Sequence, residues 1–229
     1  MINIFDCKEN NSCISKNRLI KDSEFLKYEI IYPKIVLNQK YIDHNNYNKY
    51  IIQNINDMMY RDTIKHKESI EKQATEYAKN YNNSKFKYKY QLYIDFKLGY
   101  DKNDLISILT EKHIFMGKSH DIAYLISYNY DLKTGQSIEL KDLFRKNVDY
   151  KSIINDHILK GIKKNNEVFF MEDSGFKGIN EKQNFYINKD SIIIYFEIYE
   201  IAPYNVVIPI FKINFQEIKK YLNPKYVCI

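Results

Sequence analysis

The stretch FKYKYQLYIDFKL, Phe86–Leu98, decides the fold class. Its even-numbered positions are all apolar or aromatic, whereas the odd-numbered positions carry lysine, glutamine, tyrosine and aspartate. Alternation with a period of two predicts a β-strand with one buried face, which is typical of antiparallel sheets. After a turn at Asp101–Asp104, the chain is expected to return as two further strands, Leu105–Phe115 and Ile122–Tyr130. Strands that follow one another directly favour an α+β fold over a parallel β–α–β fold.

Upstream of this strand, the pattern predicts an extended segment followed by a long helix. The extended segment, Glu24–Leu37, contains Pro33, which is excluded from a helix interior and favours an edge strand. From Asp43 to Tyr81 apolar residues recur three and four positions apart, and lysine, asparagine and glutamate occupy the opposite face. We expect Asp43 to cap this helix, which should lie across a sheet.

The second half of the chain predicts short elements. A helical turn is expected at Leu140–Phe144, and Asp149 is expected to cap a helix that reaches Lys164. The remaining predicted elements are three strands and a closing helix: Phe185–Ile187, Ile192–Tyr199, Val206–Ile213 and Phe215–Leu222. The whole pattern predicts an α+β fold with antiparallel sheets, one long N-terminal helix and shorter helices, in two intimately packed subdomains. We place their boundary near Gly117, which gives residues 1–117 and 118–229.

The formal net charge of +6 does not indicate a nucleic-acid ligand. Lysines are spread along the chain on the polar positions of the predicted elements, and the only arginines are Arg18, Arg61 and Arg145. Nucleic-acid binders usually gather both residue types on one face and use arginine for bidentate contacts. We therefore expect a solvated, charged surface.

The three cysteines, Cys7, Cys13 and Cys228, do not form a disulfide framework or a zinc motif by their spacing. Cys7 and Cys13 could pair, but we expect free thiols. No segment approaches the about 18 consecutive apolar residues of a membrane helix, and the N-terminus has no apolar core of signal-peptide length. The chain is therefore expected to lack a membrane span, and its sequence leaves the compartment open.

Three stretches carry a resemblance to a known family. YNYDLKTGQSIELKDLF, Tyr128–Phe144, resembles the strand, turn and short helix that open the second domain of RsiV-like proteins. FYINKDSIIIYFEIYEIAPY, Phe185–Tyr204, is similar to the late hairpin of that domain, and YPKI, Tyr32–Ile35, is similar to the opening of the companion PdaC-like domain. These domains form the outer region of RsiV-like anti-sigma factors and the non-catalytic part of PdaC-like peptidoglycan deacetylases, in low-GC Gram-positive bacteria.

The resemblance implies a non-enzymatic, extracytoplasmic module that recognises peptidoglycan, a wall polymer or a protein ligand without a cofactor. In the anti-sigma members the outer region senses lysozyme by binding it. Family members commonly carry a Gly-Gly-Ala-His-Gly loop, where this chain has FMGKSHD, Phe115–Asp121, and retains only Gly117 and His120. There is also no inner sigma-binding segment in the chain as given.

The expected binding residues combine this loop with the exposed end of the late hairpin. They are His120, Tyr199, Glu200, Pro203 and Tyr204. Exposed tyrosine with a polar rim suits binding, because it offers a large contact area at a low entropy cost. Common lysozymes are strongly basic and this chain is formally +6. Like-charged proteins repel during encounter, so we expect no tight binding of basic lysozyme and a ligand that is neutral or anionic.

Two other functions stay open. A wall-glycan hydrolase would need paired carboxylates, and the residues available for it are Glu197, Glu200 and His120. A structural interaction protein could instead pair with a partner chain through an edge strand, for which the segment around Pro33 is the candidate.

Overall fold

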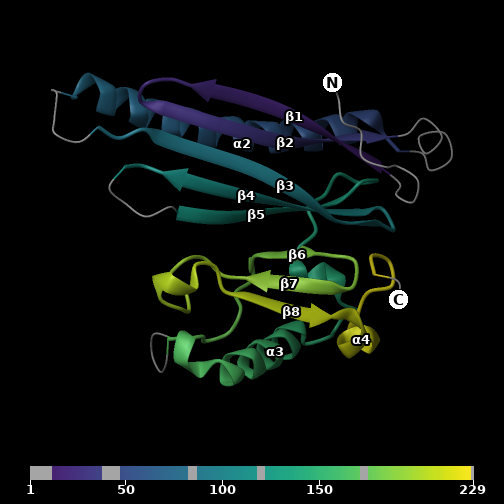
Figure 1. Cartoon of the computed structure of the whole chain (residues 1–229). Coiled ribbons are helices and arrows are strands. Elements are labelled where there is room, and N and C mark those ends of the chain that lie inside the picture. The colour runs from purple at the N-terminus through teal and green to yellow at the C-terminus, as the bar shows by residue number, and fades with distance from the viewer. Residues whose placement is uncertain (1–11, 38–46, 82–86, 118–121, 171–174, 228–229) are drawn as a thin grey trace. The chain divides into compact units, whose positions relative to one another are not determined.

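A computed structural model describes residues 12–37, 47–81, 87–117, 122–170 and 175–227 (Figure 1). The chain forms two compact units that interleave in sequence. The first comprises residues 1–97, 109–126 and 132–135, and the second comprises residues 98–108, 127–131 and 136–229. Gly117, near which we expected the boundary, therefore lies within a segment of the first unit.

The first sheet has five strands in the order β1–β2–β3–β4–β5. Its strands are β1 (Ser12–Asp22), β2 (Leu26–Leu37), β3 (Tyr90–Lys102), β4 (Leu105–Phe115) and β5 (Ile122–Asp131). The α+β class is confirmed, but the sheet is mixed rather than antiparallel, because β2 and β3 pair in parallel. The reason is the long helix α2 (Lys49–Lys79), which joins these two strands and returns the chain so that both run in the same direction.

The segment with Pro33 is not the edge of the sheet, which corrects the sequence prediction. β1 pairs with β2 along its whole length and places Lys16 opposite Pro33, so that β1 is the edge strand. The pairing of β2 with β3 covers only Leu26–Ile30 of β2. On its second side, no strand of the described residues pairs with Pro33. A proline is tolerated there, because it lacks the N–H group that a second ladder of hydrogen bonds would need.

Helix α2 lies along β2 (Figure 1). Asn48 caps it by accepting a hydrogen bond from the backbone of Tyr50, whereas Asp43, the expected cap, lies outside the described residues. The buried side chain of Asn56 accepts a hydrogen bond from the backbone N of Ile35 at 2.8 Å and donates to the carbonyl O of Ile35 at 2.9 Å. Strand β3 stops pairing with β2 at Ile30. The Asn56 amide therefore provides hydrogen-bond partners for the N–H and C=O groups of Ile35, which lies beyond that point.

The alternation in β3 is confirmed. Leu92, Ile94 and Phe96 are buried, and the intervening positions are partly or fully exposed. β3 and β4 are joined by Asn103 and Asp104, whose φ angles of 52° and 61° suit a two-residue hairpin turn.

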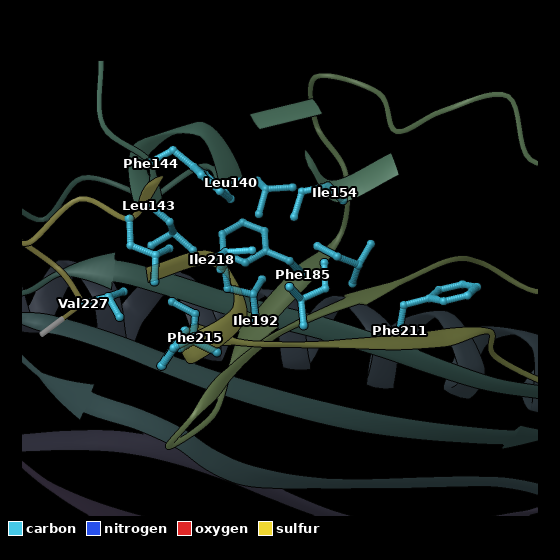
Figure 2. Packing of buried hydrophobic residues seen from close by; sticks show 14 of the residues in the cluster. Leu140, Leu143, Phe144, Ile154, Phe185, Ile192, Phe211, Phe215, Ile218 and Val227 are labelled. Atoms are coloured by element: carbon cyan, nitrogen blue, oxygen red, sulfur yellow. The ribbon is translucent and has the colours of Figure 1, made fainter. Parts of the chain in front are cut away.

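The second unit contains a three-stranded antiparallel sheet, β6–β7–β8 (Figure 1). Its elements are β6 (Phe185–Ile187), β7 (Ser191–Tyr195), β8 (Ile210–Asn214), α3 (Tyr150–Lys164), α4 (Phe215–Ile218) and the 3-10 turns η1 (Leu140–Leu143), η2 (Asn166–Val168), η4 (Tyr204–Val206) and η5 (Lys219–Tyr221). Asp149 caps α3 as predicted, by accepting from the backbone N of Ser152. The strands, α3 and the C-terminal turns share one apolar core, which includes Leu140, Leu143, Ile154, Phe185, Ile192, Phe211, Phe215 and Ile218 (Figure 2).

Two sequence predictions for this unit need correction. The strands expected at Ile192–Tyr199 and Val206–Ile213 are shorter, and residues 196–209 form a loop between β7 and β8. Hydrophobic residues continue through this loop, so the apolar pattern alone does not mark where pairing ends.

Cys13 is disulfide-bonded, which corrects the expectation of a free thiol at this position. Cys7 and Cys228 lie outside the described residues. No helix in the described part of the chain is long and apolar enough to cross a membrane.

Candidate functional site

The loop between β7 and β8, residues 196–209, opens with a tight turn. The backbone N of Glu200 donates to the carbonyl O of Glu197 at 3.1 Å. The Glu200 carboxylate in turn accepts from the backbone N of Glu197 at 2.8 Å. Tyr199, between them, has a φ of 68° and is 61% exposed. Because bulky residues rarely adopt positive φ, the closed turn holds this tyrosine at a conformational cost.

Val207 is a second strained residue in the same loop. It follows the 3-10 turn Tyr204–Val206 with φ 61° and ψ −94°, and it is 48% exposed. This conformation lies near the strained γ-turn and is unfavourable for a β-branched side chain. Such strain persists only where surrounding structure fixes the backbone, and it concentrates at binding and catalytic sites.

The loop brings two tyrosines together. The ring centres of Tyr199 and Tyr204 lie 5.7 Å apart and their planes are inclined by 37°. Both side chains are at least partly exposed, with Pro203 half-buried beside Tyr204. The pair forms an aromatic surface with polar hydroxyl groups, which we call the tyrosine loop (Tyr199–Tyr204).

An open groove of about 600 Å³ adjoins the tyrosine loop. One side is formed by residues 197–200 of the loop and the other by the segment that precedes β6. The lining residues are Asn180, Lys182, Gln183, Asn184, Glu197, Ile198, Tyr199 and Glu200. Amides and carboxylates beside an exposed aromatic ring provide both hydrogen bonds and an apolar contact for a neutral polar ligand.

Four of the five expected binding residues, Tyr199, Glu200, Pro203 and Tyr204, lie in this one loop. The fifth, His120, lies outside the described residues. Sequence reasoning missed Asn180, Gln183 and Asn184, because amides in a polar segment before a strand carry no periodic signal that separates a groove from an ordinary loop.

The carboxylates considered for hydrolysis, Glu197 and Glu200, lie in the same turn. The Glu200 carboxylate already accepts a backbone hydrogen bond that closes the turn. Within the described ranges, no three His, Cys, Asp or Glu side chains come close enough together to hold a metal ion.

Residues 141–216 match the family model described as "Protein of unknown function (DUF3298)". The matched segment includes α3, the three-stranded sheet and the tyrosine loop. A search among curated proteins finds no match.

Two solved structures of DUF3298 family proteins are similar to this chain in fold. A member from Bacteroides fragilis is 19% identical, with 94% of this chain and 96% of that chain covered at a TM-score of 0.59. A member from Pseudomonas aeruginosa PAO1 is 14% identical, with 93% of this chain and 95% of that chain covered at a TM-score of 0.57.

Proposed function

We propose that this chain is a non-enzymatic binding module for a wall-derived glycan or peptidoglycan fragment, and that the tyrosine loop and the adjoining groove form its binding surface. The observation that carries the proposal is the exposed Tyr199–Tyr204 pair beside a groove lined by amides and carboxylates. Sugar rings present an apolar face and many hydroxyl groups. Aromatic side chains fit the first and amide groups fit the second.

Two further features support this proposal. The tyrosine loop is held in place before any ligand arrives, because the Glu197–Glu200 hydrogen bonds fix the turn that carries Tyr199. Preorganisation of this kind lowers the entropic cost of binding. The disulfide at Cys13 agrees with an oxidising, extracytoplasmic location, as the RsiV-like and PdaC-like resemblance also implies.

Isothermal calorimetry with soluble, uncharged peptidoglycan fragments tests the proposal. We expect binding by the wild-type chain, and Tyr199→Ala should weaken it roughly tenfold or more, as for a central aromatic contact. Tyr50→Ala is the matched control, because Tyr50 is 69% exposed on α2 and is not among the residues that line the groove.

Three outcomes count against the proposal. Absence of binding to these fragments would remove its main support. Equal losses in Tyr199→Ala and Tyr50→Ala would argue against the tyrosine loop as the binding surface. Fragments that are cleaved during the titration, as seen by mass spectrometry, would favour a hydrolase that uses Glu197 and Glu200.

A further inference from the structure

A second, smaller pocket shares three residues with the groove. It has a volume of about 200 Å³, which is enough for a small polar group. It lies between the end of β5, the residues around η1 and the segment before β6. Its lining consists of residues 127–130, 137–140 and 181–185, so that Lys182, Gln183 and Asn184 belong to both the pocket and the groove.

Two residues that line this pocket each carry an amide oxygen that accepts no hydrogen bond from the described residues. They are Oδ1 of Asn129 and Oε1 of Gln183, and both atoms are buried. The side chains themselves are 7% and 5% exposed. A buried acceptor without a donor costs about 1–3 kcal/mol, so two such oxygens at one pocket point to donors supplied from outside the protein.

The orientation of each amide is fixed by its nitrogen. Nδ2 of Asn129 donates to the carbonyl O of Phe185 at 3.0 Å, and Nε2 of Gln183 donates to the carbonyl O of Tyr195 at 2.9 Å. Turning either amide over would place its oxygen against a carbonyl oxygen. Each nitrogen is therefore held by a strand of the β6–β7–β8 sheet, and each oxygen is the atom left to accept.

The charges around the pocket favour an uncharged donor. Two carboxylates belong to its lining, but Glu139 is paired with Lys141 at 2.6 Å and Glu181 is paired with Lys151. A ligand ammonium would meet the Lys182 side chain and carboxylates that already have partners. The free acceptors are neutral amide oxygens, which suit a neutral amide N–H or a hydroxyl group.

We infer that Asn129 and Gln183 form an acceptor subsite that binds an uncharged N–H or O–H donor, such as an amide group of the ligand held in the neighbouring groove. The inference about the ligand rests on the proposed function. The subsite itself rests on the two oriented amides, and it can be tested with a probe smaller than any wall fragment.

The experiment compares two small probes by NMR on the labelled wild-type chain. Acetamide carries N–H donors, and N,N-dimethylacetamide has the same carbonyl group without them. We expect acetamide to shift the side-chain carbonyl ¹³C resonances of Asn129 and Gln183, and N,N-dimethylacetamide to leave them in place. Equal shifts with both probes, or no shift with either, would overturn the subsite.

A second measurement uses N,N′-diacetylchitobiose, an uncharged disaccharide with two amide groups. Gln183→Leu and Asn129→Leu should each weaken its binding roughly threefold to tenfold, whereas Asn165→Ala, an exposed amide at the end of α3, should bind like the wild type. Unchanged affinity in both leucine variants would contradict the subsite. If acetamide shifts the two resonances but the disaccharide and peptidoglycan fragments do not bind, the subsite stands and the proposed function fails. If the leucine variants do not fold, the two-probe comparison on the wild type decides.

Discussion

Gly99 is a residue of the second unit where the backbone of another strand leaves no room for a side chain. A Cβ atom at this position would lie 2.2 Å from the carbonyl O of Ile187, which belongs to the backbone of β6. The neighbouring contact is equally specific, because the backbone N of Ile187 donates to the buried Oγ of Ser107 at 2.9 Å. One β3 residue and one β4 residue thus fix the position of β6.

Gly99→Ala should lower the free energy of unfolding by about 2–3 kcal/mol, since the added methyl group must displace a backbone. Urea unfolding followed by circular dichroism measures the change. Lys102→Ala, exposed on the same strand, is the control and should have little effect. A Gly99→Ala chain as stable as the control would contradict the close approach.

His66 and Lys112 form a partly buried contact between two titratable side chains. Nζ of Lys112 lies 3.1 Å from Nδ1 of His66 and 4.4 Å from the ring centre of Tyr124. Burial, followed by the charge of Lys112, lowers the pKa of His66, and burial also lowers the pKa of Lys112. A proton on His66 would enter a desolvated site beside a cation.

This contact predicts a pH dependence with a definite sign. In the unfolded chain, His66 has its ordinary pKa of about 6.5. In the folded chain, the pKa of His66 is lower. The unfolded state therefore binds more protons than the folded state as the pH falls through this range. The free energy of unfolding should therefore decrease from about pH 7.5 to about pH 5. His66→Gln keeps an acceptor for Lys112 and should flatten that decrease.

Urea titrations at several pH values measure the effect, with His113→Gln, exposed on β4, as the control. If both variants keep the wild-type slope, the decrease in stability does not come from His66.

At the scale of elements, the strained backbone of the β7–β8 loop predicts that relieving the strain stabilises the chain. Val207→Gly removes a β-branched side chain from φ 61° and ψ −94°. The variant should raise the free energy of unfolding by about 1 kcal/mol, because relief of strain exceeds the extra entropy of glycine in the unfolded chain. Val206→Gly, in the same loop without the positive φ, should instead lower stability. Thermal unfolding distinguishes the two, and a less stable Val207→Gly would contradict the strain.

At the scale of the whole molecule, charge sets which protein ligands can approach. Many acidic side chains already have basic partners: Glu29 pairs with Arg18, Glu71 with Lys67, Glu111 with Lys97, Glu139 with Lys141 and Asp190 with Lys212. With a formal charge of +6, this leaves little acidic surface for a basic partner.

We therefore predict that basic lysozymes bind this chain no more tightly than micromolar at physiological salt. A titration at low and physiological salt provides the test. Sub-micromolar affinity that weakens as salt rises would reveal a local acidic patch, of which Glu197 and Glu200 would be the first candidates.

The sequence by itself determined what depends on neighbours along the chain. The period-two pattern predicted Leu92–Phe96 as a half-buried strand, and residue type predicted Asp149 as the cap of α3. The two-residue turn at Asn103 and Asp104, within the predicted turn Asp101–Asp104, is local in the same sense. Side-chain direction, capping and φ preference are local properties, so a short window of residues is enough to specify them.

Only the tertiary structure decided the features that join distant residues. β1 was not predicted, because SCISKNRLIKD has weak alternation and forms a strand through pairing with β2. The same holds for the parallel pairing of β2 with β3 and for the place of β2 as the second strand of the sheet. The tyrosine loop was partly anticipated, but its strained backbone and the unpaired oxygens of Asn129 and Gln183 were not. Strain and unpaired buried acceptors persist only where the rest of the fold fixes them, and no local pattern encodes that constraint.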